Sequence, residues 1–152
     1  FLVQPKLNGV RARIIGNSKE YMLVSSSGKE KKFQDHILHQ LGKMPFRQWD
    51  GELYVHGWSW ERINSVCSRT VNPHPDVKQM EFHIFDYEYE DIRMKSRGWS
   101  LEGAHGIIEK QKLPNIKIVP TYWATRDTWG AHLDTFMDMG YEGNTCTKIK
   151  IN

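Results

Sequence analysis

The chain has 152 residues, of which 39% are hydrophobic and 26% are charged. This length and composition exclude a disordered or fibrous protein and allow one domain, or at most two small ones, with an apolar core. No apolar run approaches the roughly 18–20 residues that a membrane-spanning helix needs. Two cysteines, Cys67 and Cys146, are too few for a disulfide framework. We therefore expect a cytoplasmic protein without membrane contact.

The charge is distributed unevenly along the chain. Residues 1–50 carry 9 basic and 4 acidic side chains, whereas residues 51–110 carry 7 and 10. A basic N-terminal third suits a polyanionic partner such as nucleic acid or nucleotide phosphates. A solvated surface explains a charge of this size about equally well.

The first half of the chain predicts short strands and two helices. Alternation of apolar and polar residues predicts strands over residues 10–14, 21–24 and 52–55, the last opened by Asp50-Gly51. A helix is predicted over residues 34–41, with Gly42 as its stop. Ser59 is the expected N-cap of a second helix, in which one side carries Trp60, Ile63, Val66 and Cys67.

The second half continues this mixture. Two prolines predict an extended loop over residues 71–77. Strands are predicted over residues 81–89, 116–122 and 146–151, and helices over residues 100–110 and 128–139. In the strand over residues 81–89, one side should carry Phe82, Ile84 and Asp86, and the other His83, Phe85 and Tyr87. The last helix should be amphipathic, with Trp129, Leu133, Phe136 and Met137 on its apolar side, and should end at Gly140. The predicted class is α+β, with largely antiparallel sheets flanked by helices.

Candidate functional residues are dispersed rather than gathered in one common motif. The chain lacks the GxxxxGK[ST], GxGxxG, HExxH and GxSxG patterns. It contains instead, in this order, Lys6-Leu7-Asn8-Gly9-Val10-Arg11, Asp50-Gly51-Glu52, Phe85-Asp86, Glu142-Gly143 and Lys148-Ile149-Lys150.

The physical chemistry of these segments is consistent with a reactive lysine. A lysine attacks a phosphate only after it has lost its proton, and burial or neighbouring cations favour the neutral amine. Lys6 follows Pro5 and precedes Asn8-Gly9, a turn pair at which the backbone can approach a ligand. Lys148 and Lys150 are two residues apart on a predicted strand, so their side chains project from the same face. These two cations can keep the amine uncharged and stabilise a transferring phosphoryl group.

The ordered set resembles the nucleotidyltransferase motifs I, III, IIIa, IV and V of ATP-dependent DNA ligases, particularly the small phage and bacterial type. The resemblance covers nearly the whole chain and implies a single nucleotidyltransferase (adenylation) domain over residues 1–152, with the ATP-grasp-like fold of that family. It implies ATP and Mg²⁺ as cofactors, nicked double-stranded DNA as the partner, a monomer in a bacterial or phage-infected cell, and a place in DNA replication, repair and recombination.

By this resemblance, Lys6 attacks ATP, releases pyrophosphate and carries AMP as a lysyl-AMP intermediate that then activates a DNA 5′-phosphate. Lys148 and Lys150 assist as catalytic residues. The resemblance also implies that nucleotide contacts come from Gln4 at the adenine edge, Leu7, Arg11 at the ribose or a phosphate, Glu52 at the ribose, and Phe85 stacked on adenine. Mg²⁺ would be held by Glu142 and Glu52, directly or through water.

The sequence departs from the family pattern at several places. Asn8 stands where motif I usually has Asp, and Ser26 stands where ligases often have an arginine that grips DNA phosphate. The segment between Gly143 and Lys148 is much shorter than the insertion usual in the family. It is either a real shortening or, in the interpretation we favour, a place where further residues of the protein are not included. The chain begins at Phe1 and not at a methionine, so we interpret it as a fragment of a longer protein. The oligonucleotide-binding domain that follows motif V in ligases is absent from these residues.

Three other functions remain open from the sequence. The chain can be an RNA ligase or a capping-type guanylyltransferase of the same superfamily, or a basic nucleic-acid-binding module without catalysis. Taken singly, each candidate also has an ordinary explanation: Asp50-Gly51 is a common hairpin turn, Phe85 suits a core, and Lys148 and Lys150 suit a wet strand edge. His36 and His39 could face a metal, but no third ligand is evident, so we interpret them as a solvated helix face.

Overall fold

The computed structural model describes residues 1–88 and 94–147. It divides into two compact units. Unit 1 combines Phe1–Asn8 with the chain from Val119 onward, and unit 2 is Gly9–Ile118. Within the described ranges, no helix is both long and apolar enough to cross a membrane.

Unit 2 is built on a five-stranded sheet with the order β3-β2-β4-β5-β6. Neighbouring strands are antiparallel except β5 and β6, which are parallel. The strands are β2 (Val10–Gly16), β3 (Tyr21–Ser25), β4 (Gln48–Tyr54), β5 (Glu81–Glu88) and β6 (Ile116–Ile118). The α+β class with largely antiparallel sheets is therefore confirmed.

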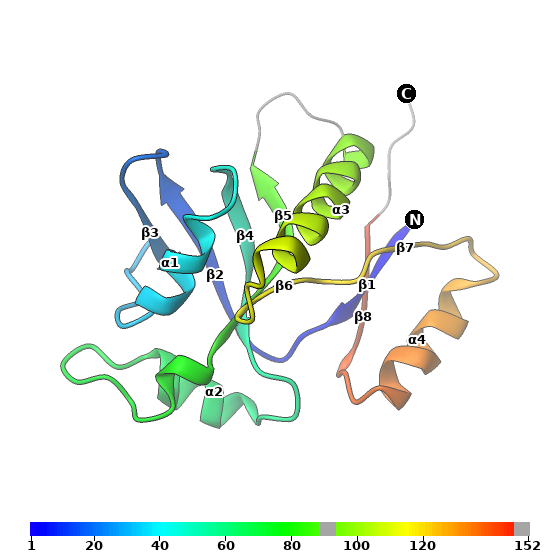
Figure 1. Cartoon of the computed structure of the whole chain (residues 1–152). Helices are drawn as coiled ribbons and strands as arrows, with labels where there is room; N and C mark the ends of the chain where they lie inside the picture. The colour runs from blue at the N-terminus through cyan, green and yellow to red at the C-terminus, as the bar shows by residue number, and fades with distance from the viewer. Residues whose placement is uncertain (89–93, 148–152) are drawn as a thin grey trace. The chain divides into compact units, whose positions relative to one another are not determined.

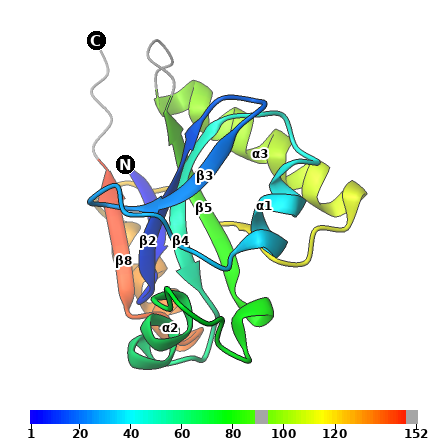
Figure 2. The same cartoon turned by 90° about the vertical axis from the view of Figure 1, so that its left-hand side faces the viewer.

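Helices cover one face of this sheet. Figures 1 and 2 show α1 (Asp35–Leu41) and α3 (Met94–Gln111) on the same side of the strands. Trp49 of β4 lines a hollow together with Ala104 and Ile107 of α3, so the buried alternate residues of β4 face the helices. The other face of the sheet is more polar, and it carries the predicted site residues of unit 2.

A shorter helix, α2 (Trp60–Cys67), begins as predicted. The Ser59 hydroxyl accepts a hydrogen bond from the Arg62 backbone N–H at 3.2 Å, which satisfies one of the unpaired donors of the first turn. Ile63, Val66 and Cys67 are buried, but Trp60 is exposed. The predicted loop that follows α2 ends in a 3₁₀ turn, Val77–Gln79. The predicted apolar side of α2 is thus buried at Ile63, Val66 and Cys67 and exposed at Trp60.

A β-bulge changes the predicted alternation of β5. Asp86 pairs with Asp50 and Ile84 with Gly51, so Phe85 is an extra residue opposite β4. After this bulge Tyr87, rather than Asp86, is buried together with Phe82 and Ile84. The predicted two-sided pattern was therefore wrong beyond Phe85, because a bulge inserts one residue and shifts the alternation. Asp50-Gly51 lies inside β4 rather than at a turn.

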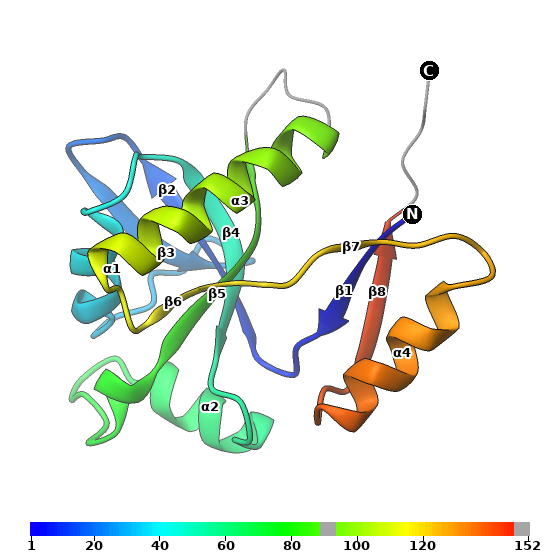
Figure 3. The same ribbon diagram turned by 45° about the vertical axis from the view of Figure 1, so that its right-hand side comes forward.

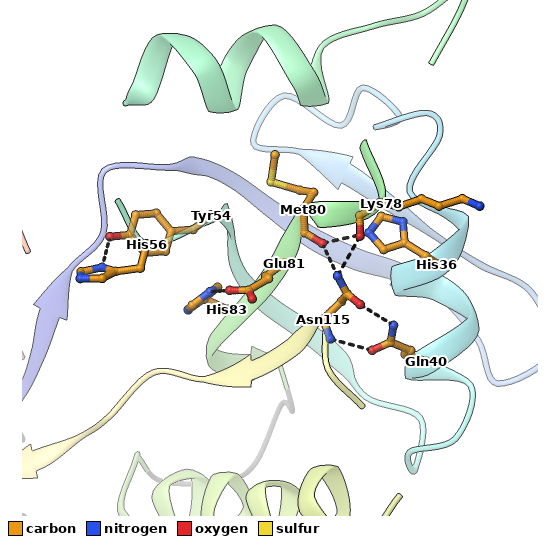
Figure 4. Close-up of polar contacts among 9 residues, drawn as sticks. All are labelled: His36, Gln40, Tyr54, His56, Lys78, Met80, Glu81, His83 and Asn115. Carbon is orange, nitrogen blue, oxygen red and sulfur yellow. Dashed lines mark hydrogen bonds and ion pairs between the residues drawn. The ribbon is translucent and has the colours of Figure 1, made fainter. Parts of the chain in front are cut away.

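Amide side chains connect α1 to the start of β6. Gln40 Nε2 donates to Asn115 Oδ1 at 2.9 Å, and the Asn115 backbone N–H donates to Gln40 Oε1 at 2.9 Å. Asn115 Nδ2 in turn donates to the backbone oxygens of Lys78 and Met80 (Figure 4). His36 Nε2 lies 2.9 Å from the same Met80 oxygen. The interpretation of His36 as solvated was therefore wrong, since it is part of this structural network.

Unit 1 contains a three-stranded antiparallel sheet and one helix, visible in Figure 3. The strand order is β7 (Tyr122–Trp123), β1 (Leu2–Lys6), β8 (Gly143–Thr147), and α4 (Trp129–Asp138) packs against β1 and β8. Its core consists of Val3, Ala124 and Phe136, with Tyr141 packed against them. On the predicted apolar side of α4, Phe136 is buried, whereas Trp129 and Met137 are 43% and 53% exposed.

Two predicted strands differ from the observed ones. The single strand predicted over residues 116–122 is divided into β6 and β7, which belong to different sheets, because Pro120 lies between them and lacks the N–H that a continuous ladder needs. The terminal strand predicted over residues 146–151 begins earlier, at Gly143, and residues 148–151 lie outside the described residues.

Candidate functional site

In unit 1, Lys6 lies at the end of β1 beside a carboxylate. Its Cα is paired with that of Gly143, the first residue of β8, and its Nζ atom lies 3.0 Å from Oε2 of Glu142. Both side chains are about half exposed, at 53% and 45%. Gly140 adopts a φ of +87° directly after α4, a left-handed conformation that ends the helix and lets the chain return towards β8. Residues from opposite ends of the sequence thus form one ion pair.

Gln4 lies two residues before Lys6 on the same strand, and its amide is held by a hydroxyl. Gln4 Nε2 donates to Thr121 Oγ1 at 2.8 Å, and Thr121 Oγ1 donates to the Val119 carbonyl at 3.2 Å. This chain of hydrogen bonds fixes the orientation of the amide. Leu7, by contrast, is a buried apolar residue with 8% exposure.

In unit 2, Arg11 of β2 makes a two-pronged contact with Asp50 of β4. Arg11 Nη2 lies 2.6 Å from Asp50 Oδ2, and Nε lies 3.2 Å from Oδ1. This hydrogen-bonded carboxylate raises the pKa of Arg11, and its negative charge adds to the effect. The guanidinium carbon is also 5.7 Å from the centroid of the half-buried Phe85 ring. Asp50 therefore holds Arg11 over the aromatic ring that the bulge presents.

Glu52 is positioned by the backbone of Gly9. The Gly9 N–H donates to Glu52 Oε2 at 3.1 Å. A Cβ atom at position 9 would lie 2.5 Å from the Leu53 carbonyl oxygen and 2.9 Å from Glu52 Oε2. Position 9 therefore requires glycine because β4 passes too close for a side chain.

The structure brings some predicted residues together within each unit. Lys6 contacts Glu142, and Arg11 lies over Phe85. Lys148 and Lys150 lie outside the described residues, so their assistance to Lys6 stays a prediction. Asp50 and Thr121 have positioning roles that sequence reasoning missed. Asp50 stood within a quoted motif, whereas no sequence signal indicated Thr121.

The predicted metal ligands are two carboxylates, Glu142 in unit 1 and Glu52 in unit 2. Among residues 1–88 and 94–147, no three His, Cys, Asp or Glu side chains gather into a metal site. Mg²⁺ does not require such a cage, since it keeps several waters and takes one or two carboxylates. Glu142 and Glu52 each offer oxygen ligands of this kind, so their assignment to a metal stays a prediction.

Two adjoining hollows of unit 2, of about 160 and 240 Å³, lie elsewhere. They share Met44, Arg47 and Trp49 and lie on the helix-covered side of the sheet. The described residues that line them include none of the predicted site residues. The candidate site is therefore an open polar sheet face in unit 2 and the Lys6–Glu142 pair in unit 1.

No protein-family model and no curated protein sequence matches the chain. Solved structures do match it. A structure described as a Lig E DNA ligase, from a study of DNA binding with a minimal scaffold, has a TM-score of 0.73 and 21% identity over 94% of this chain and 53% of its own. The adenylate form of Chlorella virus DNA ligase gives 0.70 and 18%, covering 97% and 53%. The ligase domain of Mycobacterium tuberculosis LigD gives 0.61 and 17%, covering 94% and 46%.

These similarities establish the fold. The chain has the nucleotidyltransferase fold of ATP-dependent DNA ligases, as its motifs predicted. It spans about half the length of the ligases it matches.

Proposed function

We propose that the chain is the adenylation domain of an ATP-dependent DNA ligase, in which Lys6 becomes covalently attached to AMP. The proposal is supported by the Lys6–Glu142 contact of 3.0 Å. The resemblance assigned Lys6 and Glu142 to two motifs that are far apart in the sequence. If Lys6 were an ordinary surface lysine, there would be no reason to expect it to contact a residue of another motif.

The proposed reaction is a phosphoryl transfer to nitrogen. The deprotonated Nζ of Lys6 attacks the α-phosphorus of ATP, a phosphorus–nitrogen bond forms, and the bond to the pyrophosphate leaving group breaks. The AMP then passes to a DNA 5′-phosphate, and a 3′-hydroxyl displaces it when the nick is sealed. Lys148 and Lys150 would stabilise the negative charge on the transferring group.

The remaining residues would bind and orient the nucleotide. Phe85 offers an aromatic face for adenine, and Gln4 offers an amide for the adenine edge. Arg11 would contact ribose or phosphate, and Glu52 would accept from the ribose. The positions of Arg11 and Glu52 are set by Asp50 and Gly9, so these side chains would bind with little loss of rotamer freedom.

Magnesium would be held by carboxylates, with Glu142 and Glu52 as the expected ligands. When bound, it supplies positive charge that stabilises the phosphates of ATP and the leaving pyrophosphate. Glu142 also holds the Lys6 amine at 3.0 Å before the nucleotide binds, so this carboxylate serves the nucleophile as well.

The intact mass of the protein tests the proposal. Incubation with ATP and Mg²⁺ should add the mass of one AMP to the wild-type chain and to Lys19→Ala, which removes an exposed loop lysine. Lys6→Ala should gain nothing. An adduct on Lys6→Ala that equals the wild type, or an adduct that forms equally well in EDTA, would refute the assignment.

A second arm separates ligases from other nucleotidyltransferases. ATP should compete with labelled ATP and GTP should not, and the adenylated protein should transfer AMP to nicked DNA in preference to nicked RNA. A GTP adduct would support a capping-type enzyme, and a preference for RNA would support an RNA ligase. Salt-sensitive DNA binding without any adduct would support a non-catalytic module.

A further inference from the structure

His83 lies next to Glu52 on the polar face of the unit 2 sheet. The two residues are Cα partners in the antiparallel pair of β4 and β5. Residues directly opposite each other in such a pair project to the same face, with Cβ atoms about 4.5–5.5 Å apart. The bulge at Phe85 comes after His83 and does not change this pairing. A histidine that no motif singled out thus lies beside the carboxylate proposed to hold ribose.

The His83 ring has two neighbours, Glu81 and Tyr54, and Figure 4 shows its hydrogen bond with Glu81. Its Nε2 lies 2.9 Å from Oε1 of Glu81, two residues earlier on β5. The ring also packs edge-on against Tyr54, with centroids 5.1 Å apart and an interplanar angle of 89°. Tyr54 itself is 4% exposed, and its hydroxyl lies 2.7 Å from Nδ1 of His56. The imidazole therefore has little freedom to turn.

The contact with Glu81 determines what the other ring nitrogen can do. A carboxylate accepts hydrogen bonds, so Nε2 of His83 carries the proton of this contact. In the neutral ring Nδ1 is then an acceptor. Within the described chain, His83 makes no hydrogen bond through Nδ1. His83 is 13% exposed at its side chain, so a ligand on this face can still reach it.

Glu52 and His83 together present two acceptors side by side. The Gly9 N–H donates to Glu52 Oε2 and so orients the carboxylate, whose oxygens are hydrogen-bond acceptors. Two adjacent acceptors match two adjacent hydroxyl donors, such as the 2′- and 3′-hydroxyls of a ribose. They do not match a phosphate, which is itself an acceptor and an anion. The chemistry of the pair therefore indicates a vicinal diol.

The position of the pair along β5 agrees with this chemistry. Phe85, the proposed adenine platform, is two residues from His83, a step of about 6.8 Å along a strand. Phe85 and His83 are both half-buried, and the centroid of the Phe85 ring lies 5.7 Å from the guanidinium carbon of Arg11, a residue of the polar face. If the base of a nucleoside stacks on Phe85, its sugar lies next to that ring. The Glu52–His83 pair is one of the groups near enough to contact the sugar.

We propose that His83, held by Glu81, accepts a hydrogen bond from a ribose hydroxyl and, with Glu52, selects ribonucleotides over deoxyribonucleotides. This inference rests on the proposed function, because it assigns the sugar subsite of the same nucleotide. The new claim is that His83 of β5 is the residue that discriminates against nucleotides lacking a ribose hydroxyl.

The experiment compares initial rates of adduct formation with ATP, 2′-deoxy-ATP and 3′-deoxy-ATP, read by intact mass. The wild-type protein should prefer ATP over at least one deoxy analogue. His83→Ala should reduce that preference about two- to tenfold, as expected for one lost hydrogen bond, mainly by slowing ATP. His83→Gln keeps an acceptor and should retain more of the preference, and Glu81→Gln should weaken it less than His83→Ala.

Controls separate selection from folding and from the proposed function. His39→Ala, which removes an exposed histidine of α1, should keep the wild-type ratios, and thermal unfolding should show that His83→Ala is folded. A ratio unchanged in His83→Ala, or a wild-type chain that uses all three nucleotides equally, would overturn the inference. If no nucleotide gives an adduct, the proposed function fails, and equilibrium dialysis of ATP against the deoxy analogues still measures whether His83 selects the sugar.

Discussion

The amine of Lys6 and the carboxylate of Glu142 lie 3.0 Å apart, joining the last residue of β1 to the residue that precedes β8. The Lys6 amine thus contacts the same carboxylate that we expect to bind magnesium. A cation bound to Glu142 and the ammonium form of Lys6 would therefore compete for the same oxygens. We infer that loading of the metal and release of the amine are coupled events.

Glu142→Gln tests this relationship. Because both side chains are about half exposed, the free energy of unfolding should change by less than about 1 kcal/mol. Adduct formation should fall about tenfold or more, which corresponds to a barrier about 1.4 kcal/mol higher, and the concentration of Mg²⁺ needed for half-maximal rate should rise. The readouts are denaturant unfolding and adduct rate across a magnesium series. A wild-type magnesium dependence in the variant would contradict the assignment.

Gly9→Ala should destabilise the chain by about 1–3 kcal/mol, as overpacking does. The added Cβ would lie 2.5 Å from the Leu53 carbonyl oxygen, so β2 and β4 would have to separate. The bond from the Gly9 N–H to Glu52 should weaken as well. Chemical denaturation measures the first effect, and the KM for ATP measures the second.

Gly106→Ala is the matched control for this prediction. A Cβ at position 106 would meet no atom within 4 Å, and the residue lies inside α3. Alanine should therefore raise the free energy of unfolding by up to about 1 kcal/mol, through helix propensity. Equal effects of the two substitutions would show that the close approach at Gly9 is not what matters.

The core of unit 1 should depend on Phe136 and not on its neighbour. Phe136 is 2% exposed and packs with Val3 and Ala124, so Phe136→Ala should cost about 3–5 kcal/mol. Met137 is 53% exposed, and Met137→Ala should change stability by no more than about 0.5 kcal/mol. Urea unfolding followed by circular dichroism distinguishes the two. A similar cost for both would show that Met137 is packed as tightly as Phe136, contrary to its exposure in the structure.

Burial of Cys67 should make the chain less stable in alkali. Burial raises the pKa of this thiol from its ordinary value of 9.0. Above that pH the unfolded thiol ionises while the folded one stays neutral, so the unfolded state binds fewer protons and the free energy of unfolding falls as pH rises. In a Cys146→Ser background, Cys67→Ala should lose less stability between about pH 8 and pH 10.

This pH range lies below the one in which Tyr141 ionises, because burial raises the pKa of Tyr141 above its ordinary value of 10.0. In the same background the native thiol should resist a thiol reagent until the chain unfolds, since Cys67 is 1% exposed. Rapid reaction of the folded protein would show that the site opens without global unfolding.

Local patterns in the sequence determined most elements of the fold. The alternation at residues 10–14 and the Ser59 cap predicted β2 and α2, because period-two burial and an N-cap hydroxyl are decided by neighbouring residues. The order of Lys6, Glu52, Phe85 and Glu142 predicted the nucleotidyltransferase fold, which the similarity to solved ligases supports. Residue types and their order along the chain were thus enough to predict the fold, whereas the roles of these residues stay predictions.

Only the tertiary structure decided which side chains meet. The bulge at Phe85 depends on the register between β5 and β4, so the switch of burial from Asp86 to Tyr87 has no local signal. The exposure of Trp129 and Met137 depends on how little of α4 the small sheet of unit 1 can cover. The contacts of Lys6 with Glu142, and of His83 with Glu81 beside Glu52, follow from strand pairing and close packing between distant segments, which composition and periodicity do not specify.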